Sequence, residues 1–187
     1  MGLGATGWTA WRYRSDLVGF SERFRANLPK PDSSPASPPR PVILPHEKDY
    51  AEFLGNLDLR YIAPHEILAP HRRELNGIAN VLPPRQYWKR MIPTLQVADE
   101  LRQRLGCKLR YITSAFRSPE YNAQCPGASP KSYHTKNLAL DLVYDCPPPD
   151  AIAEAKKMRA EGIFRGGLGL YQTFIHIDTR GRNSDWG

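Results

Sequence analysis

His134, Asp141 and His176 are the residues whose types and positions could support metal chemistry. His134 lies in KSYHTKNLALDLVYD (131–145), where Asp141 interrupts an otherwise apolar run, and His176 lies in the later stretch FIHIDTRG (174–181). Two imidazoles and one carboxylate can form a catalytic zinc site, which uses three protein ligands and keeps a fourth position for water. A histidine beside a strand is more often a hydrogen-bonded structural residue, so the spacing alone leaves a structural role open.

Two predicted strands would present these side chains. Leucines occupy alternate positions of residues 138–144, so Asp141 points away from the face that the leucines share. Within residues 166–181, His176 and Asp178 share one face of a predicted final strand, roughly 6.5 to 7 Å apart. Asp178 is therefore close enough to orient the imidazole of His176 or to serve as a general base.

A helix and a further strand are predicted ahead of these elements. Apolar residues recur mostly at three- and four-residue steps over residues 84–106, which indicates one long core helix, bent or interrupted at Pro93 and ended by Gly106. A strand is predicted over residues 108–116. Arg117 then occupies the corner between that strand and the next helix, a place where side chains face a cleft.

The next helix begins with Ser118 as its N-cap and Pro119 at its first position, and another proline-started helix is predicted over residues 150–161. The pattern contains no internal repeat. Helices and strands thus follow one another through the second half of the chain.

Three segments are predicted along the chain. Residues 1–28 form an N-terminal segment with a possible short amphipathic helix over 15–28. Residues 29–47 form a linker rich in proline and serine, a composition that stays extended and resists packing. Residues 48–187 have the texture of one globular domain.

Composition limits the classes of partner. The chain has 187 residues, of which 41% are hydrophobic, so it can bury one good core. Lys and Arg number 26 against 19 Asp and Glu, giving a net charge of +7, which favours anionic partners such as nucleic acid, acidic lipid or a wall polymer. No apolar stretch approaches the roughly 20 residues of a membrane span, and the N-terminus shows no export signal.

The cysteines are Cys107, Cys125 and Cys146, an odd number without C-x-x-C spacing. This argues against a zinc knuckle and a dense disulfide framework. One bridge at most can form. Cys125 and Cys146 flank the stretch that contains His134 and could be joined, but separately packed thiols are the favoured interpretation.

Four ordered motifs resemble those of one enzyme family. SYHTKNLALD (132–141) resembles the S-x-H-x-x-G-x-A-x-D signature of the zinc D-alanyl-D-alanine carboxypeptidases, peptidoglycan metallopeptidases that share a fold with the hedgehog signalling domain. SAFRSPEYN (114–122), GGLGLY (166–171) and FIHIDTRGRNSDW (174–186) are similar to further segments of that family. The resemblance covers roughly residues 48–187.

The resemblance implies roles for individual residues. His134, Asp141 and His176 would bind Zn²⁺, and Ser132 and Arg117 would hold the carboxylate or carbonyl of a peptide stem. A water activated by the metal would attack the scissile amide. The guanidinium of Arg117 suits this role because its geometry matches a carboxylate, whereas the Ser132 hydroxyl could equally satisfy the loop backbone.

The resemblance also implies the fold and the setting. It predicts the α+β class, with a small, mostly antiparallel sheet packed against helices. It further predicts a monomer that acts on peptidoglycan stem peptides in the cell envelope, in the periplasm or wall, with no specific nucleic-acid partner. A phage-type lysis enzyme, which would need no leader, remains an alternative.

The sequence departs from the family pattern at two positions. Asn137 replaces the signature's glycine, and asparagine is the residue that next most readily adopts a left-handed backbone. Thr173 stands three residues before His176, where many relatives place a glutamate as general base. Asp178 is the obvious substitute for that catalytic carboxylate.

Residues outside the motifs receive structural interpretations. His46, His65 and His71 are predicted to be structural, with the last two on a surface helix. Arg180 either rims the cleft or belongs to a solvated tail that also holds Trp186. Tyr171 is predicted to be a core aromatic, with a phenol that assists the oxyanion as the alternative. None of these six residues is needed for the zinc hypothesis.

Three function classes follow from the sequence. The leading one is a zinc metallopeptidase that acts on cell-wall peptides, either as a D,D-carboxypeptidase or as a cross-link endopeptidase. The second is a non-catalytic zinc-containing module that binds peptidoglycan. The third, a nucleic-acid binder, rests on charge alone, because the basic residues are scattered along the chain.

Overall fold

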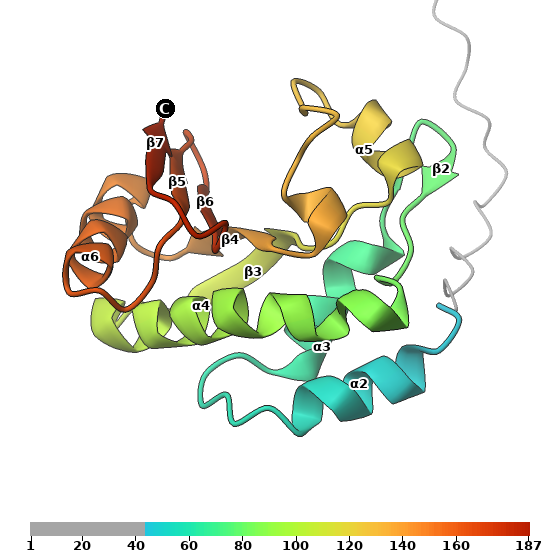
Figure 1. Ribbon diagram of the computed structural model, residues 1–187, viewed down its shortest axis with the longest axis horizontal. Helices are drawn as coiled ribbons and strands as arrows, with labels where there is room; N and C mark the ends of the chain where they lie inside the picture. The colour runs from blue at the N-terminus through green and yellow to red at the C-terminus, as the bar shows by residue number, and fades with distance from the viewer. Residues whose placement is uncertain (1–43) are drawn as a thin grey trace, which may run out of the picture. The chain divides into compact units, whose positions relative to one another are not determined.

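The structure of the protein is a computed structural model that describes residues 44–187 (Figure 1). The predicted helix within residues 15–28 and most of the predicted linker 29–47 lie outside the described residues. Within the described part, no helix combines the length and the apolar character needed to cross a membrane.

Helices and strands are mixed along the chain (Figure 1). The helices are α2 (Glu47–Gly55), α3 (Pro64–Leu68), α4 (Ile92–Leu105), α5 (Pro119–Gln124) and α6 (Pro148–Ala160), with 3₁₀ helices η1 (Ala69–Arg72), η2 (Arg85–Met91) and η3 (His134–Lys136). The strands are β1 (Glu74–Leu75), β2 (Ile78–Ala79), β3 (Leu109–Ser114), β4 (Ala139–Tyr144), β5 (Gly167–Leu170), β6 (Ile175–Asp178) and β7 (Ser184–Trp186). This composition confirms the predicted α+β class.

A five-stranded sheet organises the domain, with strand order β3-β4-β6-β5-β7. The pairs β3/β4, β4/β6 and β6/β5 are antiparallel, and only β7 runs parallel to its neighbour β5. In the β4/β6 pair, Asp141 lies directly opposite His176. The sheet is therefore mostly antiparallel, as predicted, and its centre brings together two residues that are 35 positions apart in sequence.

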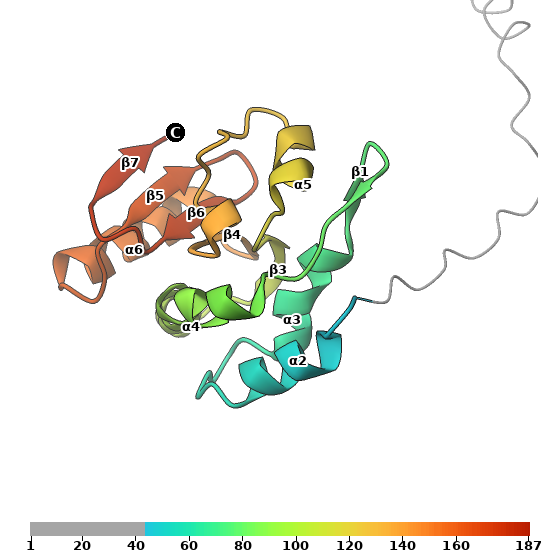
Figure 2. The same cartoon turned by 45° about the vertical axis from the view of Figure 1, so that its right-hand side comes forward.

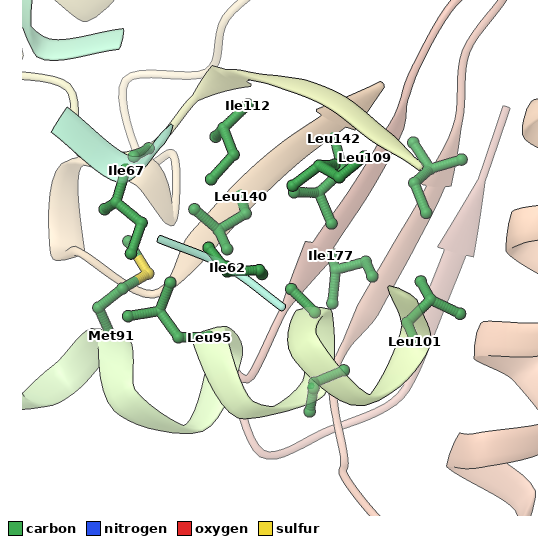
Figure 3. Close-up of a cluster of buried hydrophobic side chains, with 14 of the residues drawn as sticks. Ile62, Ile67, Met91, Leu95, Leu101, Leu109, Ile112, Leu140, Leu142 and Ile177 are labelled. Atoms are coloured by element: carbon green, nitrogen blue, oxygen red, sulfur yellow. The ribbon is translucent and has the colours of Figure 1, made fainter. Parts of the chain in front are cut away.

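The hydrophobic core lies between the sheet and the helices. Figures 1 and 2 show α4 crossing one side of the sheet, with α6 beside β5. Figure 3 shows the buried side chains at this interface, which include Met91, Leu95 and Leu101 on the helical side and Leu140, Leu142 and Ile177 on the sheet. Because successive residues of a strand point to opposite faces, burying Leu140 and Leu142 under α4 sends Asp141 to the other face.

The predicted long helix over residues 84–106 is two helices in the structure. Residues 85–91 form the 3₁₀ helix η2, and α4 begins at Ile92 with Pro93 in its first turn. Amides in the first turn of a helix have no partner within the helix, so the missing N–H of Pro93 costs nothing there. Gly106 caps the helix in the left-handed conformation, with φ 63°, which confirms the predicted end.

The predicted final strand within residues 166–181 is a hairpin followed by a further strand. β5 and β6 are joined by a tight turn in which the Tyr171 amide donates to the Phe174 carbonyl at 3.1 Å. The chain then returns at β7 to pair with β5. The turn was missed because its residues carry no glycine or proline, the strongest signals for a break in a strand.

A disulfide joins Cys107 to Cys146, and Cys125 is the free cysteine. The interpretation of three separate thiols was therefore wrong, and so was the alternative pairing of Cys125 with Cys146. The antiparallel register of Leu109 with Tyr144 explains the observed bond. It brings Cys107, two residues before β3, next to Cys146, two residues after β4, with Cα atoms 6.0 Å apart.

His71 is fully buried rather than on a surface helix. It lies in η1, where its ring makes an edge contact with the ring of Tyr50 at 6.1 Å between centroids. Burial lowers the pKa of His71 to about 4, so the imidazole is neutral at pH 7. The surface prediction holds for His65, which is exposed.

Reduction of the Cys107–Cys146 bond is expected to destabilise the domain. The bond closes a loop with a sequence separation of 39, for which chain entropy predicts a loss of up to about 4 kcal/mol in the free energy of unfolding. Urea titration of a Cys146→Ser variant measures the loss, with Cys125→Ser as the matched control that should unfold like the unaltered protein. Equal unfolding midpoints for the two variants would contradict the expectation.

Candidate metal centre

Three local structures bring the candidate ligands to one face of the sheet. His134 lies in η3, and Asn137 ends that turn in the left-handed conformation, with φ 57° and ψ 46°. Asn137 therefore does what the signature's glycine would do, as predicted, and directs the chain into β4. Asp141 and His176 project from neighbouring strands on the face opposite α4.

The ligand atoms of the three residues converge on one point. His134 Nε2 lies 3.2 Å from both Asp141 Oδ1 and His176 Nδ1, and His176 Nδ1 lies 2.8 Å from Asp141 Oδ1. All three side chains are buried. Among residues 44–187 this is the one group of three or more such side chains close enough to share a metal ion.

Hydrogen bonds on the far side of each imidazole fix its orientation. His134 Nδ1 donates to the Ala115 carbonyl at 2.7 Å, and His176 Nε2 donates to Asp178 Oδ2 at 3.0 Å. Since a neutral imidazole carries one proton, these bonds leave the lone pairs of His134 Nε2 and His176 Nδ1 directed into the centre. This pattern is typical of metal-binding histidines.

The electrostatics also suit a cation. Burial would raise the pKa of Asp141, but attraction and hydrogen bonds from His134 and His176 hold it well below its usual range, so the carboxylate is ionised. Burial lowers the pKa of His134, against the opposing attraction of Asp141. The centre therefore holds a buried anion beside a neutral imidazole.

Asp178 lies behind His176 and is fully buried. Arg180 binds both of its oxygens, with Nε 2.8 Å from Oδ1 and Nη2 2.5 Å from Oδ2, and the Gly167 amide donates to Oδ1 at 3.0 Å. Burial would raise the pKa of Asp178, but the hydrogen bonds of Arg180 and His176 hold it well below its usual range. This placement suits the orienting role, and it does not favour the general-base role.

Arg117 occupies the predicted corner after β3, but its contacts are mainly with the metal centre. Its Nη2 donates to Asp141 Oδ2 at 2.6 Å, and its Nε donates to the Ser114 hydroxyl at 2.6 Å. Nη1 forms no hydrogen bond with any residue of the described region, and the side chain lines a cavity. Arg117 thus orients Asp141 and keeps one donor group for a ligand, while Ser114 is a positioning residue that the sequence did not single out.

Ser132 also lines the cavity, and its hydroxyl accepts a hydrogen bond from the His134 amide at 3.3 Å. The Ser132 carbonyl accepts a further bond from the Thr135 hydroxyl at 2.7 Å. The structure therefore shows Ser132 stabilising the turn that holds His134. Its contact with substrate stays a prediction.

A cavity of about 450 Å³ opens in front of the three ligands. Its lining includes residues 126–129 and 131–133 and the aromatic side chains of Tyr171, Phe174 and Trp186. Tyr171 is 42% exposed, so the core interpretation of this residue was wrong. Arg180 rims the cavity and does not belong to a solvated tail.

Thr173, which replaces the family's glutamate, is exposed in the β5–β6 turn and is not among the residues lining the cavity. Among the described residues that line the cavity, the one carboxylate is that of Asp141. Its Oδ1 faces the imidazoles and its Oδ2 is bound by Arg117. The cavity thus has no free carboxylate.

A family model described as Peptidase M15 matches residues 60–178. The chain belongs to the peptidase M15 family. No curated protein and no solved structure matches it. Because M15 peptidases are metallopeptidases, membership supports a peptidase, and the buried cluster of His134, Asp141 and His176 could bind the metal ion. The match ends at Asp178, so β7 lies beyond it.

Replacement of the group behind His176 is expected to weaken metal binding. Asp178→Asn keeps the shape of the side chain but removes the charge that fixes the imidazole, and such partners are worth about 10- to 100-fold in metal affinity. Competition with a chromophoric chelator measures the affinity. Asp145→Asn, which removes an exposed partner of Arg110, is the control and should bind metal like the unaltered protein. Equal affinity in both variants would show that Asp178 does not orient the ligand.

Proposed function

We propose that this protein is a zinc-dependent peptidase that hydrolyses an amide bond in the stem peptides of bacterial peptidoglycan, as a D,D-carboxypeptidase or a cross-link endopeptidase. The observation that carries the proposal is the convergence of His134 Nε2, Asp141 Oδ1 and His176 Nδ1 beneath an open cavity. Membership of the M15 family supplies the class of reaction. The sequence resemblance to the D-alanyl-D-alanine carboxypeptidases supplies the class of substrate.

Zinc is the metal that best suits this donor set. Two nitrogens and one oxygen, buried and directed to one point, match the ligands of catalytic zinc sites. Ligands bound tetrahedrally at about 2.0 to 2.1 Å would be separated by about 3.3 Å. The observed separations of 2.8 to 3.2 Å are close to that value, so small side-chain shifts would admit the ion.

The residues of the chain would hold the reactants in place. A bound zinc ion would polarise the scissile carbonyl and supply an activated water. His134 and His176 hold their lone pairs toward the ion because Ala115 and Asp178 bind their opposite nitrogens. Arg117 orients Asp141 through the hydrogen bond from its Nη2 to Oδ2.

The charges lining the cavity support a substrate that carries carboxylates. Arg117 presents its free Nη1 group there, and Lys131 also lines the cavity, with no ion pair to any described residue. Because Nε and Nη2 of Arg117 already bind Ser114 and Asp141, Nη1 is the group suited to donate a charge-assisted hydrogen bond to the carboxylate at the end of a peptide. The net charge of +7 further favours approach to an anionic wall polymer.

The setting we propose is the cell envelope, in the periplasm or the wall, with the protein acting as a monomer. The Cys107–Cys146 disulfide supports a compartment outside the reducing cytoplasm. A phage-type lysis enzyme that reaches the wall from inside the cell is the alternative route to the same substrate.

A non-catalytic peptidoglycan-binding module is the second candidate function. Two observations favour it: Thr173 stands where relatives place a catalytic glutamate, and the described cavity wall offers no free carboxylate as general base. Such a module would keep the metal and the affinity for stem peptides but release no product.

Mass spectrometry of purified muropeptides incubated with the protein tests the proposal. We expect one zinc ion per chain and product release that a chelator abolishes. His134→Ala should lower kcat/KM by more than about 100-fold, because it removes a ligand and not merely a group behind one. His65→Ala, at an exposed histidine outside the cavity, is the matched control and should keep full activity. Zinc and muropeptide binding without product would instead support the non-catalytic module.

A further inference from the structure

β7 lies outside the family match, yet it contributes a wall of the cavity through Trp186. The strand pairs with β5, with Gly169 opposite Trp186. The indole ring of Trp186 lies near the ring of His176, with centroids 5.1 Å apart. A residue outside the matched range 60–178 therefore contacts a predicted metal ligand.

Two glycines on β5 provide the space that the indole occupies. A Cβ atom at Gly169 would lie 2.5 Å from Trp186 Nε1, and one at Gly167 would lie 2.9 Å from Trp186 Cη2. Both distances are shorter than side-chain contacts allow, so any larger residue at Gly169 would displace the ring. Because Gly167 and Gly169 of the GGLGLY motif have no side chains, the indole of Trp186 can pack directly against β5.

The polar edge of the indole is directed at a second residue of the cavity. Trp186 Nε1 donates to the Tyr171 hydroxyl oxygen at 3.0 Å, and the Tyr171 ring stacks on Phe174 with centroids 4.3 Å apart. Because the hydroxyl oxygen accepts from the indole, its own proton remains available to another acceptor. Tyr171 is therefore a fixed hydrogen-bond donor at the edge of the cavity.

We propose that Trp186 is a positioning residue of the peptidase site. Its indole packs against Gly167 and Gly169 and covers the ring of His176. It thereby directs the Tyr171 hydroxyl toward an oxygen atom of the bound peptide. This inference rests on the proposed function, since it assigns Tyr171 to a carbonyl or carboxylate oxygen of the same substrate. It adds a specificity contact to the cavity that Lys131 also lines.

Kinetics of a double-mutant cycle test the proposal, with zinc-loaded full-length protein and a synthetic stem pentapeptide. Trp186→Phe keeps an aromatic cover and removes the indole N–H, and Tyr171→Phe removes the hydroxyl. Each should raise KM by about 3- to 10-fold with kcat nearly unchanged, as expected for one neutral hydrogen bond. Both substitutions act through the same hydroxyl. The KM of the double variant should therefore not exceed the larger of the two single-variant KM values.

The matched control is Trp88→Phe, which removes the hydrogen bond of a buried indole to the Pro83 carbonyl at 2.9 Å, outside the cavity. It should lower the unfolding temperature and leave KM unchanged. A purely structural role for Trp186 would give the same result as this control. Unchanged KM in Trp186→Phe, or effects of Trp186→Phe and Tyr171→Phe that multiply, would overturn the proposal.

Zinc affinity gives a readout that does not need turnover. Trp186→Ala uncovers His176 and should weaken zinc binding by about tenfold, whereas Trp186→Phe should bind zinc like the unaltered protein. If the unaltered protein binds zinc but releases nothing from the pentapeptide, the proposed function fails. The role of Trp186 is then decided by this comparison alone: weaker binding in Trp186→Ala supports it, and equal binding in all three proteins overturns it.

Discussion

The antiparallel pairing of β4 with β6 is the constraint on which the rest of the structure depends. It places Asp141 directly opposite His176, and residues so paired have Cβ atoms about 4.5 to 5.5 Å apart, within reach of one ion. Leu140 and Leu142 bury the other face of β4 under α4. A slip of one residue would move the carboxylate into the apolar core, so the core itself fixes the metal centre.

The buried charges of the centre form two pairs, each with one arginine. Arg117 binds Asp141, and Arg180 binds Asp178. An isolated carboxylate at such depth would take up a proton. His134 and His176 keep Asp141 ionised, and Arg180 and His176 keep Asp178 ionised. Buried ion pairs add little net stability, because desolvation offsets their attraction. In this centre the two pairs orient the metal ligands. The Arg117–Asp141 pair fixes the carboxylate that binds the metal, and the Arg180–Asp178 pair fixes the imidazole of His176.

The sequence predicted most of the centre because strand alternation and motif order are local signals. The face of the sheet on which Asp141 lies was predicted from the leucines on either side of it. The ends of the helices were predicted from proline and glycine. The features it did not predict depend on contacts between distant segments. The partner of Cys146 required the register of β3 with β4, and the burial of His71 required the packing of α2 against η1. The place of Trp186 required the return of the chain to pair with β5.

The central claim is that three side chains, brought together by one strand pairing and one turn, bind a single metal ion. Anomalous diffraction at the zinc absorption edge, on crystals grown with zinc, tests it most directly. We expect one strong peak, with Nε2 of His134, a carboxylate oxygen of Asp141 and Nδ1 of His176 each about 2.0 to 2.2 Å away. A peak bonded to other residues, or no peak at this centre, would contradict the account.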